Sequence, residues 1–414
     1  MPRFLLTLTP ALAALALAAP PVAAEQSLVE TESFNLRLGG YAGSFSSYQW
    51  TGYDTAGLTP EHTGVNAGVL RLEWKAGLTD NVALDVQNRF FWNIAPSASA
   101  STGLVGLGST VPPQRTVDLR SVLVDEPGVL VEHDVDRLAL SFFTPVADVT
   151  VGRQAVTWGN SSLFTVADLW TQFSPFELDT SQKRGVDALR VLGYPADGLE
   201  VEAIVVDRGD LENLSGGARA AWTLDRGDYY LGAGRNYDTV WGLMGFAVDL
   251  DDFRGHSEIA LPYSEDRHQL DAPRLTVGID YFSTRVTALL EYHFNGPGVV
   301  DPAQYLTALS SDAVARGERY FVGKHYVGAT VAYLPWADLV TLSLTGIANV
   351  TDPSLLVSPA LMYAISQNVT ASLGAYVGVG EEPAFDLTSP TPVTIGSEFG
   401  LYPNVIFLQL AGFI

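Results

Sequence analysis

Two-residue alternation of apolar and polar side chains is the sequence feature that most constrains this fold. In residues 69–76 the apolar and charged positions separate cleanly: Leu70, Leu72, Trp74 and Ala76 against Arg71, Glu73 and Lys75. Residues 82–92 and 285–294 repeat the pattern over about ten residues each. Because successive side chains of a strand point to opposite faces, the alternation predicts strands with one apolar and one polar face.

Two architectures have strands of this kind, and the details favour one of them. A soluble sandwich also alternates, with its apolar face turned inward. Segments of about ten residues, however, are long enough to cross a bilayer as tilted strands. Aromatic residues such as Phe90 and Trp92 lie near strand ends, where the bilayer interfaces would be. We therefore predict an all-β fold, a transmembrane antiparallel β-barrel whose apolar face meets lipid.

Turn residues divide the chain into hairpins. Short turns rich in Pro, Gly, Asn and Asp are expected at 144–148, 194–198, 225–228, 334–338 and 366–368. Longer connections are expected at 48–63, 94–116, 157–184, 295–322 and 380–392. Within 301–316, the pair Asp301-Pro302 would start a short helix that Gly317 could end. The count of candidate strands is about 18, between roughly 16 and 20.

The N-terminal residues predict export. Met1-Pro2-Arg3 precedes an apolar run from Phe4 to Ala19, and small residues lead up to Ala24. The run is shorter than the ~20 apolar residues of a membrane-spanning helix, so residues 1–24 are expected to be a signal peptide that is cleaved after Ala24. Residues 25–414 would then form a single barrel, with an inserted segment at about 157–184.

Charge and cysteine content limit the possible partners. The chain has 46 Asp and Glu against 23 Lys and Arg, and no cysteine. A chain this acidic is not expected to bind nucleic acid. Without cysteine it has no disulfide framework, and a closed barrel would supply stability through paired backbone groups. The acidic groups could lie in solvated loops or in a cation-attracting lumen, and the composition leaves both interpretations open.

The C-terminal residues predict a final barrel strand. Residues 405–414 alternate, and Phe413 is penultimate. Outer-membrane barrels usually end in a strand with a terminal aromatic, which the barrel assembly machinery recognises as a partner. One difficulty follows from the topology. In an even-stranded barrel, a tight turn at Tyr402-Pro403-Asn404 would lie on the outer side, where longer loops are expected.

The inserted segment at 157–184 is too long for a turn and rich in aromatic side chains: Trp158, Phe164, Trp170, Phe173 and Phe176. An exposed loop of this composition would be a liability, so we expect it to fold into the lumen or against the rim. It could form a constriction, or only pack against the wall through Arg–Asp pairs that involve nearby residues such as Asp168, Glu177, Asp179 and Lys183. The candidate pore-lining or constriction residues are Arg71, Glu73, Asp85, Arg89, Arg153, Arg184, Asp187, Arg190, Arg285 and Glu291.

The sequence gives little support to an enzyme. Its six histidines have no metal-ligand spacing, and it lacks both a Gly-x-Ser-x-Gly elbow and a glycine-rich phosphate loop. His256 and His268 are expected in a solvated acidic loop together with Glu258, Glu265 and Asp266. In a strand, the adjacent His256 and Ser257 would point to opposite faces, which argues against a Ser–His pair. We therefore predict no catalytic site, no cofactor and no bound metal.

Three stretches carry a resemblance to a known group of proteins. They are Val151-Gly152-Arg153-Gln154 with Trp158-Gly159-Asn160, then 183–190, and the junction of Gly317-Glu318-Arg319-Tyr320 with 323–326. In these stretches the chain resembles the alginate-export-like and related porin-like families of outer-membrane barrels. The resemblance implies passive transport across the bacterial outer membrane. It does not imply a particular solute, since the basic pore lining of an alginate exporter is not evident in so acidic a chain.

The predicted function is thus a porin-like channel for small hydrophilic solutes, with a mild preference for cations. Outer-membrane lipid and small polar solutes would be its partners, and the oligomeric state stays open. A structural or adhesive barrel that transports nothing is the main alternative, and a barrel enzyme a weaker one.

Overall fold

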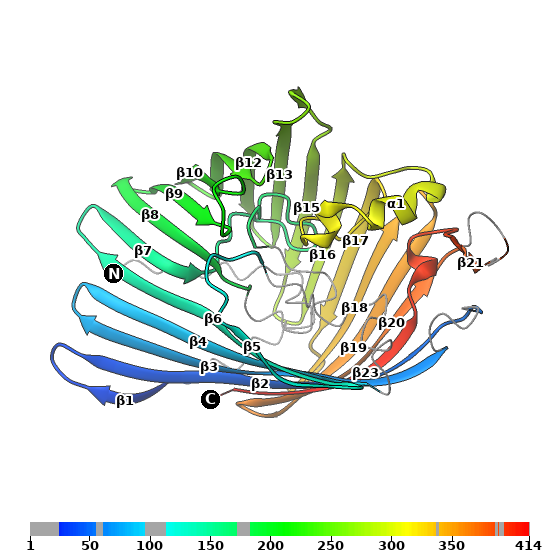
Figure 1. Ribbon diagram of the computed structural model, residues 1–414, viewed down its shortest axis with the longest axis horizontal. Coiled ribbons are helices and arrows are strands. Elements are labelled where there is room, and N and C mark those ends of the chain that lie inside the picture. The colour runs from blue at the N-terminus through cyan, green and yellow to red at the C-terminus, as the bar shows by residue number, and fades with distance from the viewer. Residues whose placement is uncertain are drawn as a thin grey trace.

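The computed structural model describes residues 25–54, 61–95, 113–171, 183–336, 339–385, 388 and 393–413. The predicted signal peptide and its cleavage site after Ala24 lie outside these residues. The main sheet has 21 strands, each antiparallel to its neighbours, of which β1, β5 and β14 are short additions and the other 18 form the wall. The wall closes where β23 pairs with β2, so the sheet is a barrel (Figure 1). The all-β fold and the count of about 18 strands are confirmed.

The wall strands, in chain order, are β2 (Asn35–Trp50), β3 (His62–Thr79), β4 (Val82–Ile94), β6 (Val129–Phe143), β7 (Ala147–Gln154), β8 (Val186–Ala196), β9 (Leu199–Asp207), β10 (Ser215–Leu224), β11 (Gly227–Asn236), β12 (Thr239–Leu250), β13 (Phe253–Ser264), β15 (Arg274–Phe282), β16 (Val286–Asn295), β17 (His325–Tyr333), β18 (Val340–Asn349), β19 (Ser354–Ser366), β20 (Val369–Val379) and β23 (Asn404–Phe413). The additions are β1 (Gln26–Glu30), which pairs with β2, β5 (Arg120–Glu126), which pairs with β6, and β14 (Gln269–Leu270), which pairs with β13.

The two ends of the barrel differ in the length of their connections. At one end, which we call the turn end, the five predicted hairpin turns join β6 to β7, β8 to β9, β10 to β11, β17 to β18 and β19 to β20. At the other end, the loop end, the longest connections are 95–128, 155–185, 296–324 and 380–403. The first wall strand begins and the last one ends at the turn end.

The topological difficulty at Tyr402-Pro403-Asn404 disappears in the structure. These residues are not a hairpin turn, because the connection that we expected to end at 392 continues to 403. It contains β21 (Ala384–Phe385), β22 (Val393–Thr394) and a 3-10 helix, η5 (Phe399–Leu401). The connection between β20 and β23 is therefore a long loop at the loop end, as an even-stranded barrel requires.

One strand contradicts its sequence interpretation. His256 and Glu258 belong to β13 and are buried in the wall, whereas we expected them in a solvated loop. The outward positions at this end of the strand are Gly255 and Ser257 rather than large apolar residues, so the alternation that identifies the other strands is weak here. His268 does lie in a connection, between β13 and β15.

The two faces of the wall differ sharply in polarity. Leu290 is 50% exposed on the outside, and its neighbour Glu291 is completely buried on the inside. Large apolar side chains such as Val277 and Leu373 are exposed in the same way around the barrel. A belt of exposed apolar residues of this extent would be a liability in water and suits contact with lipid.

The predicted short helix is present as three short pieces. They are η3 (Pro302–Gln304), α1 (Tyr305–Leu309) and α2 (Asp312–Ala315). The Asp301 side chain accepts a hydrogen bond from the Ala303 backbone N–H at 3.0 Å, and Gly317 has φ of +71° where the helical stretch ends. In the described part of the chain, no helix has the length and apolar character needed to cross a membrane.

Candidate functional site

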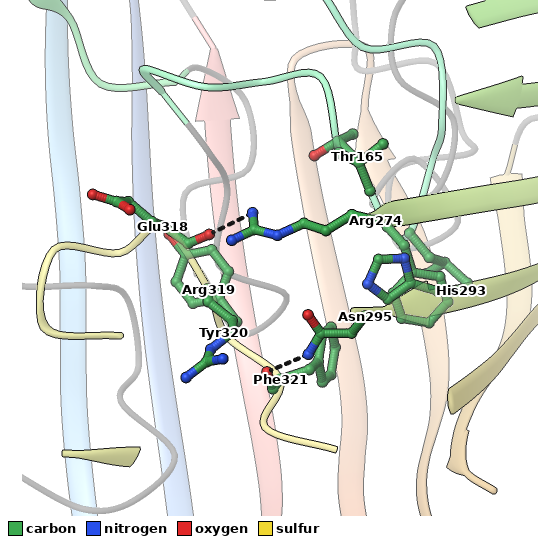
Figure 2. A pocket seen from close by; sticks show the side chains of 11 residues that line it. Thr165, Arg274, His293, Asn295, Glu318, Arg319, Tyr320 and Phe321 are labelled. Carbon is green, nitrogen blue, oxygen red and sulfur yellow. Dashed lines mark hydrogen bonds between the residues drawn. The ribbon is translucent and has the colours of Figure 1, made fainter. Parts of the chain in front are cut away.

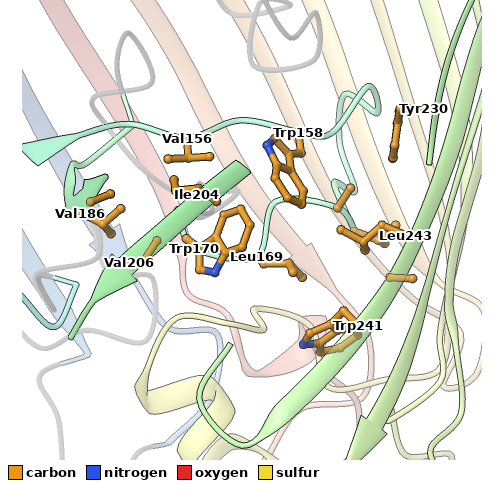
Figure 3. Packing of buried hydrophobic residues seen from close by; sticks show 14 residues of the cluster. Val156, Trp158, Leu169, Trp170, Val186, Ile204, Val206, Tyr230, Trp241 and Leu243 are labelled. Carbon is orange, nitrogen blue, oxygen red and sulfur yellow. The ribbon is translucent and has the colours of Figure 1, made fainter. Parts of the chain in front are cut away.

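Residues 155–171, which follow β7, lie inside the barrel against its inner face. They contain most of the described part of the insertion expected at about 157–184, and from here on the inserted segment means residues 155–171. Trp158 and Trp170 meet edge to face with ring centroids 4.6 Å apart (Figure 3). Around them is an apolar cluster to which the segment contributes Val156, Trp158, Val166, Ala167, Leu169 and Trp170, and the wall Val186, Ala188, Ile204, Val206, Tyr230, Trp241, Leu243 and Ala260. Phe173, Phe176, Glu177 and Asp179 lie outside the described residues.

Glu258 of β13 fixes the segment through its backbone. One carboxylate oxygen accepts hydrogen bonds from the N–H groups of Asn160 and Ser161, the latter at 2.8 Å. The other oxygen accepts from Val166 at 3.0 Å and from Ala167 at 3.4 Å. The carboxylate thus satisfies four backbone donors of a buried turn that has no strand partner.

Glu291 of β16 does the same a few residues further along the segment. Its carboxylate accepts hydrogen bonds from the N–H groups of Ser162 at 2.7 Å and of Leu163 and Phe164 at 3.0 Å each. Thr276 of β15 adds a bond from its hydroxyl to the Phe164 carbonyl at 2.7 Å. Between them, the two glutamates receive seven backbone donors.

Asp168 holds the segment from within. Its carboxylate accepts from the N–H groups of Trp158 at 2.8 Å and Gly159 at 3.0 Å, and it forms a buried ion pair with Lys183. Lys183 precedes β8, so this pair ties the segment to the chain just before it re-enters the wall. A charged side chain that is buried together with its partner keeps a fixed geometry, because separating the two would leave an unpaired charge.

A second group of buried charges lies on the wall between β3 and β8. Arg71 meets Asp136 at 2.8 Å, and Arg153 meets Asp187 at 2.8 Å. Arg115, from the connection before β5, binds Asp134 at 2.7 Å and Asp136 at 3.0 Å. In this network each of these guanidinium groups has a carboxylate partner.

The predicted pore-lining residues are distributed unevenly. Arg71, Arg153 and Asp187 belong to this network, and Asp85 joins it through Gln87, which donates to Asp85 at 3.2 Å and accepts from Arg71 at 3.2 Å. The others lie apart from it: Glu73 beside Lys75 at 3.9 Å, Arg89 over the Phe91 ring at 5.0 Å, Arg190 paired with Glu202 at 2.7 Å, Arg184 half-buried before β8, Glu291 under the inserted segment, and Arg285 exposed in the turn before β16.

The role of the two glutamates was not foreseen. Glu291 was expected to line a pore, and Glu258 to lie in a loop. Their partners are backbone N–H groups that lie 91 to 129 positions away in the chain. Backbone donors leave no trace in a sequence, so the only available signal was a carboxylate at an inward-facing position of a strand.

A cavity of about 50 Å³ opens between the inserted segment, the wall and the connection that follows α2 (Figure 2). Its floor is aromatic, with Phe164 stacked on His293 at a centroid distance of 5.0 Å. Its polar lining comes from Arg274, Asn295, Glu318 and Arg319. The inserted segment and the 296–324 connection therefore meet inside the barrel.

Glu398 connects two further loops at the loop end. Its buried carboxylate accepts hydrogen bonds from the Val322 N–H at 2.9 Å, from the Asn349 amide at 2.8 Å and from the Tyr326 hydroxyl. Its own N–H donates to Asp352 at 2.6 Å. Burial, reinforced by the charge of Asp352, raises the pKa of Glu398 to about 7. The 296–324 and 380–403 connections are thus joined through one acid that titrates near neutral pH.

Metal binding has no support in the described residues, where no group of three or more His, Asp or Glu side chains could hold a metal ion. His256 is buried in β13 with a ring nitrogen 2.9 Å from Glu291, and 3.2 Å separates its other ring nitrogen from Asp280. It serves as a bridge between wall strands.

Comparisons with known proteins show that the chain is similar in fold to solved structures. No protein-family model and no curated protein matches the sequence. Among solved structures, the chain is similar to a BenF-like porin from Pseudomonas fluorescens Pf-5, with 10% identity, 92% of this chain and 98% of that chain covered, and a TM-score of 0.57. It is similar to OccAB3 of Acinetobacter baumannii, with 12% identity, coverage of 92% and 99%, and a TM-score of 0.56.

A third similar structure, OccD3 (OpdP) of Pseudomonas aeruginosa, has 9% identity, 98% coverage of both chains and a TM-score of 0.54. These comparisons do not single out the alginate-export family. The similar proteins are porins and related outer-membrane barrels, and the chain has their fold: a closed, 18-stranded outer-membrane-type β-barrel.

Proposed function

We propose that the mature chain is a channel of the bacterial outer membrane, through which small hydrophilic solutes pass, and that residues 157–184 narrow the passage. The observation that carries the proposal is the anchoring of the inserted segment. Two wall carboxylates hold seven of its backbone N–H groups inside the barrel. A segment that only covered the rim would not need acceptors on the inner wall.

The membrane location follows from the outer face. An apolar belt around the barrel fits a hydrocarbon layer, and a chain exported by residues 1–24 would reach it. The turn end would face the periplasm and the loop end the outside. Outer-membrane lipid and the barrel assembly machinery are then the chain's partners.

Small solutes fit the proposal better than a polymer. OpdK of Pseudomonas aeruginosa, another barrel with a similar fold (11% identity, TM-score 0.52), was solved with vanillate. The alginate-export likeness rests on short motifs alone, and here Arg71, Arg115 and Arg153 of the network between β3 and β8 are paired with carboxylates. We propose solutes of vanillate's size as the class to test, without assigning one.

We further propose a mild preference for cations. The short turns and the strand ends beside them are rich in acidic residues: Asp80, Asp148, Asp197, Glu200, Asp225, Asp228, Asp249, Asp251 and Asp252 against Arg226, Arg254 and Arg285. An acidic mouth raises the local concentration of cations, and the effect is strongest at low salt because charges more than about 10 Å apart are screened at 0.1 M.

Single-channel recording in planar bilayers tests these proposals. We expect discrete conductance steps, and a reversal potential of the cation-selective sign under a tenfold KCl gradient. Deletion of residues 160–180 should enlarge the steps. A barrel that inserts but never conducts would be the non-transporting alternative, anion selectivity would refute the charge argument, and unchanged steps after the deletion would remove the segment from the passage.

A further inference from the structure

Four arginines gather at the loop end, where Glu318 is the described carboxylate within ion-pair distance of them. Arg208 and Arg316 both lie over the ring of Tyr237, with their guanidinium carbons 4.8 Å and 4.3 Å from its centroid. We call Arg208, Arg274, Arg316 and Arg319 the arginine cluster. In the described part of the chain, the one ion pair within 4.0 Å that the cluster makes joins Arg316 to Glu318, at 2.6 Å.

The other three guanidinium groups donate only to neutral acceptors. Arg208 donates to the Asn236 side-chain oxygen at 2.8 Å, and Arg274 to the Glu318 backbone carbonyl at 3.2 Å. Arg319 donates to the Pro297 and Ala308 carbonyls and to the Ser311 hydroxyl, at 3.0, 3.3 and 3.0 Å. The Nε–H groups of Arg208, Arg274 and Arg319 are buried and have no acceptor among the described residues.

Burial makes this excess of positive charge costly. Arg208 is 6% exposed and Arg274 8%. Burial lowers the pKa of Arg208 and of Arg319, which expresses the same penalty on the charged form. The network between β3 and β8 avoids the penalty by pairing its arginines with aspartates. A buried cation without an ionic partner is expected to have one supplied from outside the chain.

Space for such a partner lies next to the cluster. The cavity of about 50 Å³ described above is lined by Arg274 and Arg319, by the Asn295 side chain and by the aromatic rings of Tyr320 and Phe321 (Figure 2). It exceeds the roughly 10–15 Å³ that one water molecule needs. Glu318 also lines it, but its carboxylate is engaged by Arg316.

We propose that the arginine cluster and this cavity form a binding site for a phosphate oxyanion, either free or carried by a larger molecule. A phosphate group carries close to two negative charges near neutral pH and offers several acceptor oxygens. This matches Arg274 and Arg319, the two cluster arginines that line the cavity and whose Nε–H groups lack an acceptor among the described residues. Arg274 lies over the Trp241 ring at 4.7 Å, which keeps its guanidinium plane oriented beside the cavity. The site is independent of whether the barrel conducts.

Calorimetric titration of the refolded mature chain with inorganic phosphate tests the proposal, with chloride at the same ionic strength as the reference. We expect saturable binding of phosphate and no saturable binding of chloride. The variant Arg274→Gln should weaken phosphate binding about tenfold, as expected when a charged hydrogen-bond donor is lost. The control Arg37→Gln, an exposed arginine near the start of β2 at the turn end, should bind as the unmodified chain does.

A second titration distinguishes the source of the phosphate. Vesicles with phosphorylated lipopolysaccharide are compared with vesicles of the dephosphorylated lipid. Binding of the phosphorylated vesicles alone assigns the site to a lipid headgroup, and binding of inorganic phosphate assigns it to a free anion. Equal responses to phosphate and chloride, together with equal responses to both vesicles, would overturn the proposal, and this comparison needs no variant to fold.

Discussion

His256 of β13 and Glu291 of β16 meet across the intervening strand β15, with 2.9 Å between the imidazole Nε2 and the carboxylate oxygen. The same carboxylate receives three backbone N–H groups of the inserted segment. One side chain therefore joins the rigid wall to the polypeptide inside it. Substitutions at this junction should therefore change conductance through the passage while the barrel wall stays folded.

Glu258 of β13 is the second carboxylate that joins the wall to the inserted segment. Its removal should loosen the segment and leave the barrel closed. Glu258→Ala leaves up to four buried N–H groups without acceptors, each worth about 1–3 kcal/mol. We expect larger and noisier conductance steps, with far-ultraviolet circular dichroism unchanged. The matched control is Glu132→Ala, since Glu132 pairs with Arg120 of β5 away from the segment. Identical conductance recordings for the two variants would show that Glu258 does not control the passage.

Opposite faces of one strand should respond differently to the same substitution. Leu344, at the middle of β18, is 53% exposed outward, and its neighbour Ser343 occupies the inward face. Leu344→Arg should cost about 2–4 kcal/mol of folding free energy in bilayers, because it puts a charge near the lipid midplane. Ser343→Arg should fold normally and shift conductance. Urea titration in lipid vesicles measures both, and equal losses of stability would mean that the faces are assigned incorrectly.

Stability should depend on pH through Glu398. Its folded pKa of about 7 lies above the ordinary value of 4.5, so the folded state favours the neutral acid. The contribution of this group to the free energy of unfolding is roughly 3 kcal/mol and is fully present below about pH 4.5. It decreases as pH rises and is lost above about pH 7.

Groups from every packed element face Glu398: Tyr326, Asn349, Asp352, Tyr305, Arg319 and Tyr402. Glu398→Gln should flatten the difference between pH 5 and 8 in thermal unfolding, whereas Glu382→Gln, an exposed control in the same loop, should retain it. A Glu398→Gln profile that still follows the unmodified chain would exclude this acid as the source.

Cell fractionation checks the location. The mature chain should sediment with the outer membrane and migrate faster on gels when it is not heated, because a closed barrel resists unfolding by detergent. Recovery in the soluble periplasmic fraction would contradict the proposed location.

The wall could be predicted from the sequence because strand alternation is a local property. Segments such as 285–294 carry their own period, and turns such as 225–228 their own chemistry, so neither depends on the rest of the chain. Where Gly255 and Ser257 replaced apolar residues, this signal failed and β13 was missed.

The interior could not be predicted in the same way. Glu258 and Asn160 are 98 positions apart, and their bond is defined by barrel closure rather than by either residue's neighbours. The arginine cluster likewise combines residues from two connections and the start of one strand. Inward-facing charges could be recognised as such, but their partners could not.

The anchoring of the inserted segment also makes the interior sensitive to strand register. The segment precedes both of its acceptors in the chain, so its final position is available only after β13 and β16 are paired. A slip of one residue in either strand would turn its glutamate towards lipid and leave the segment's N–H groups unpaired. A misaligned barrel would thus have an untethered interior, so the same two carboxylates make the position of the segment depend on the register of the wall.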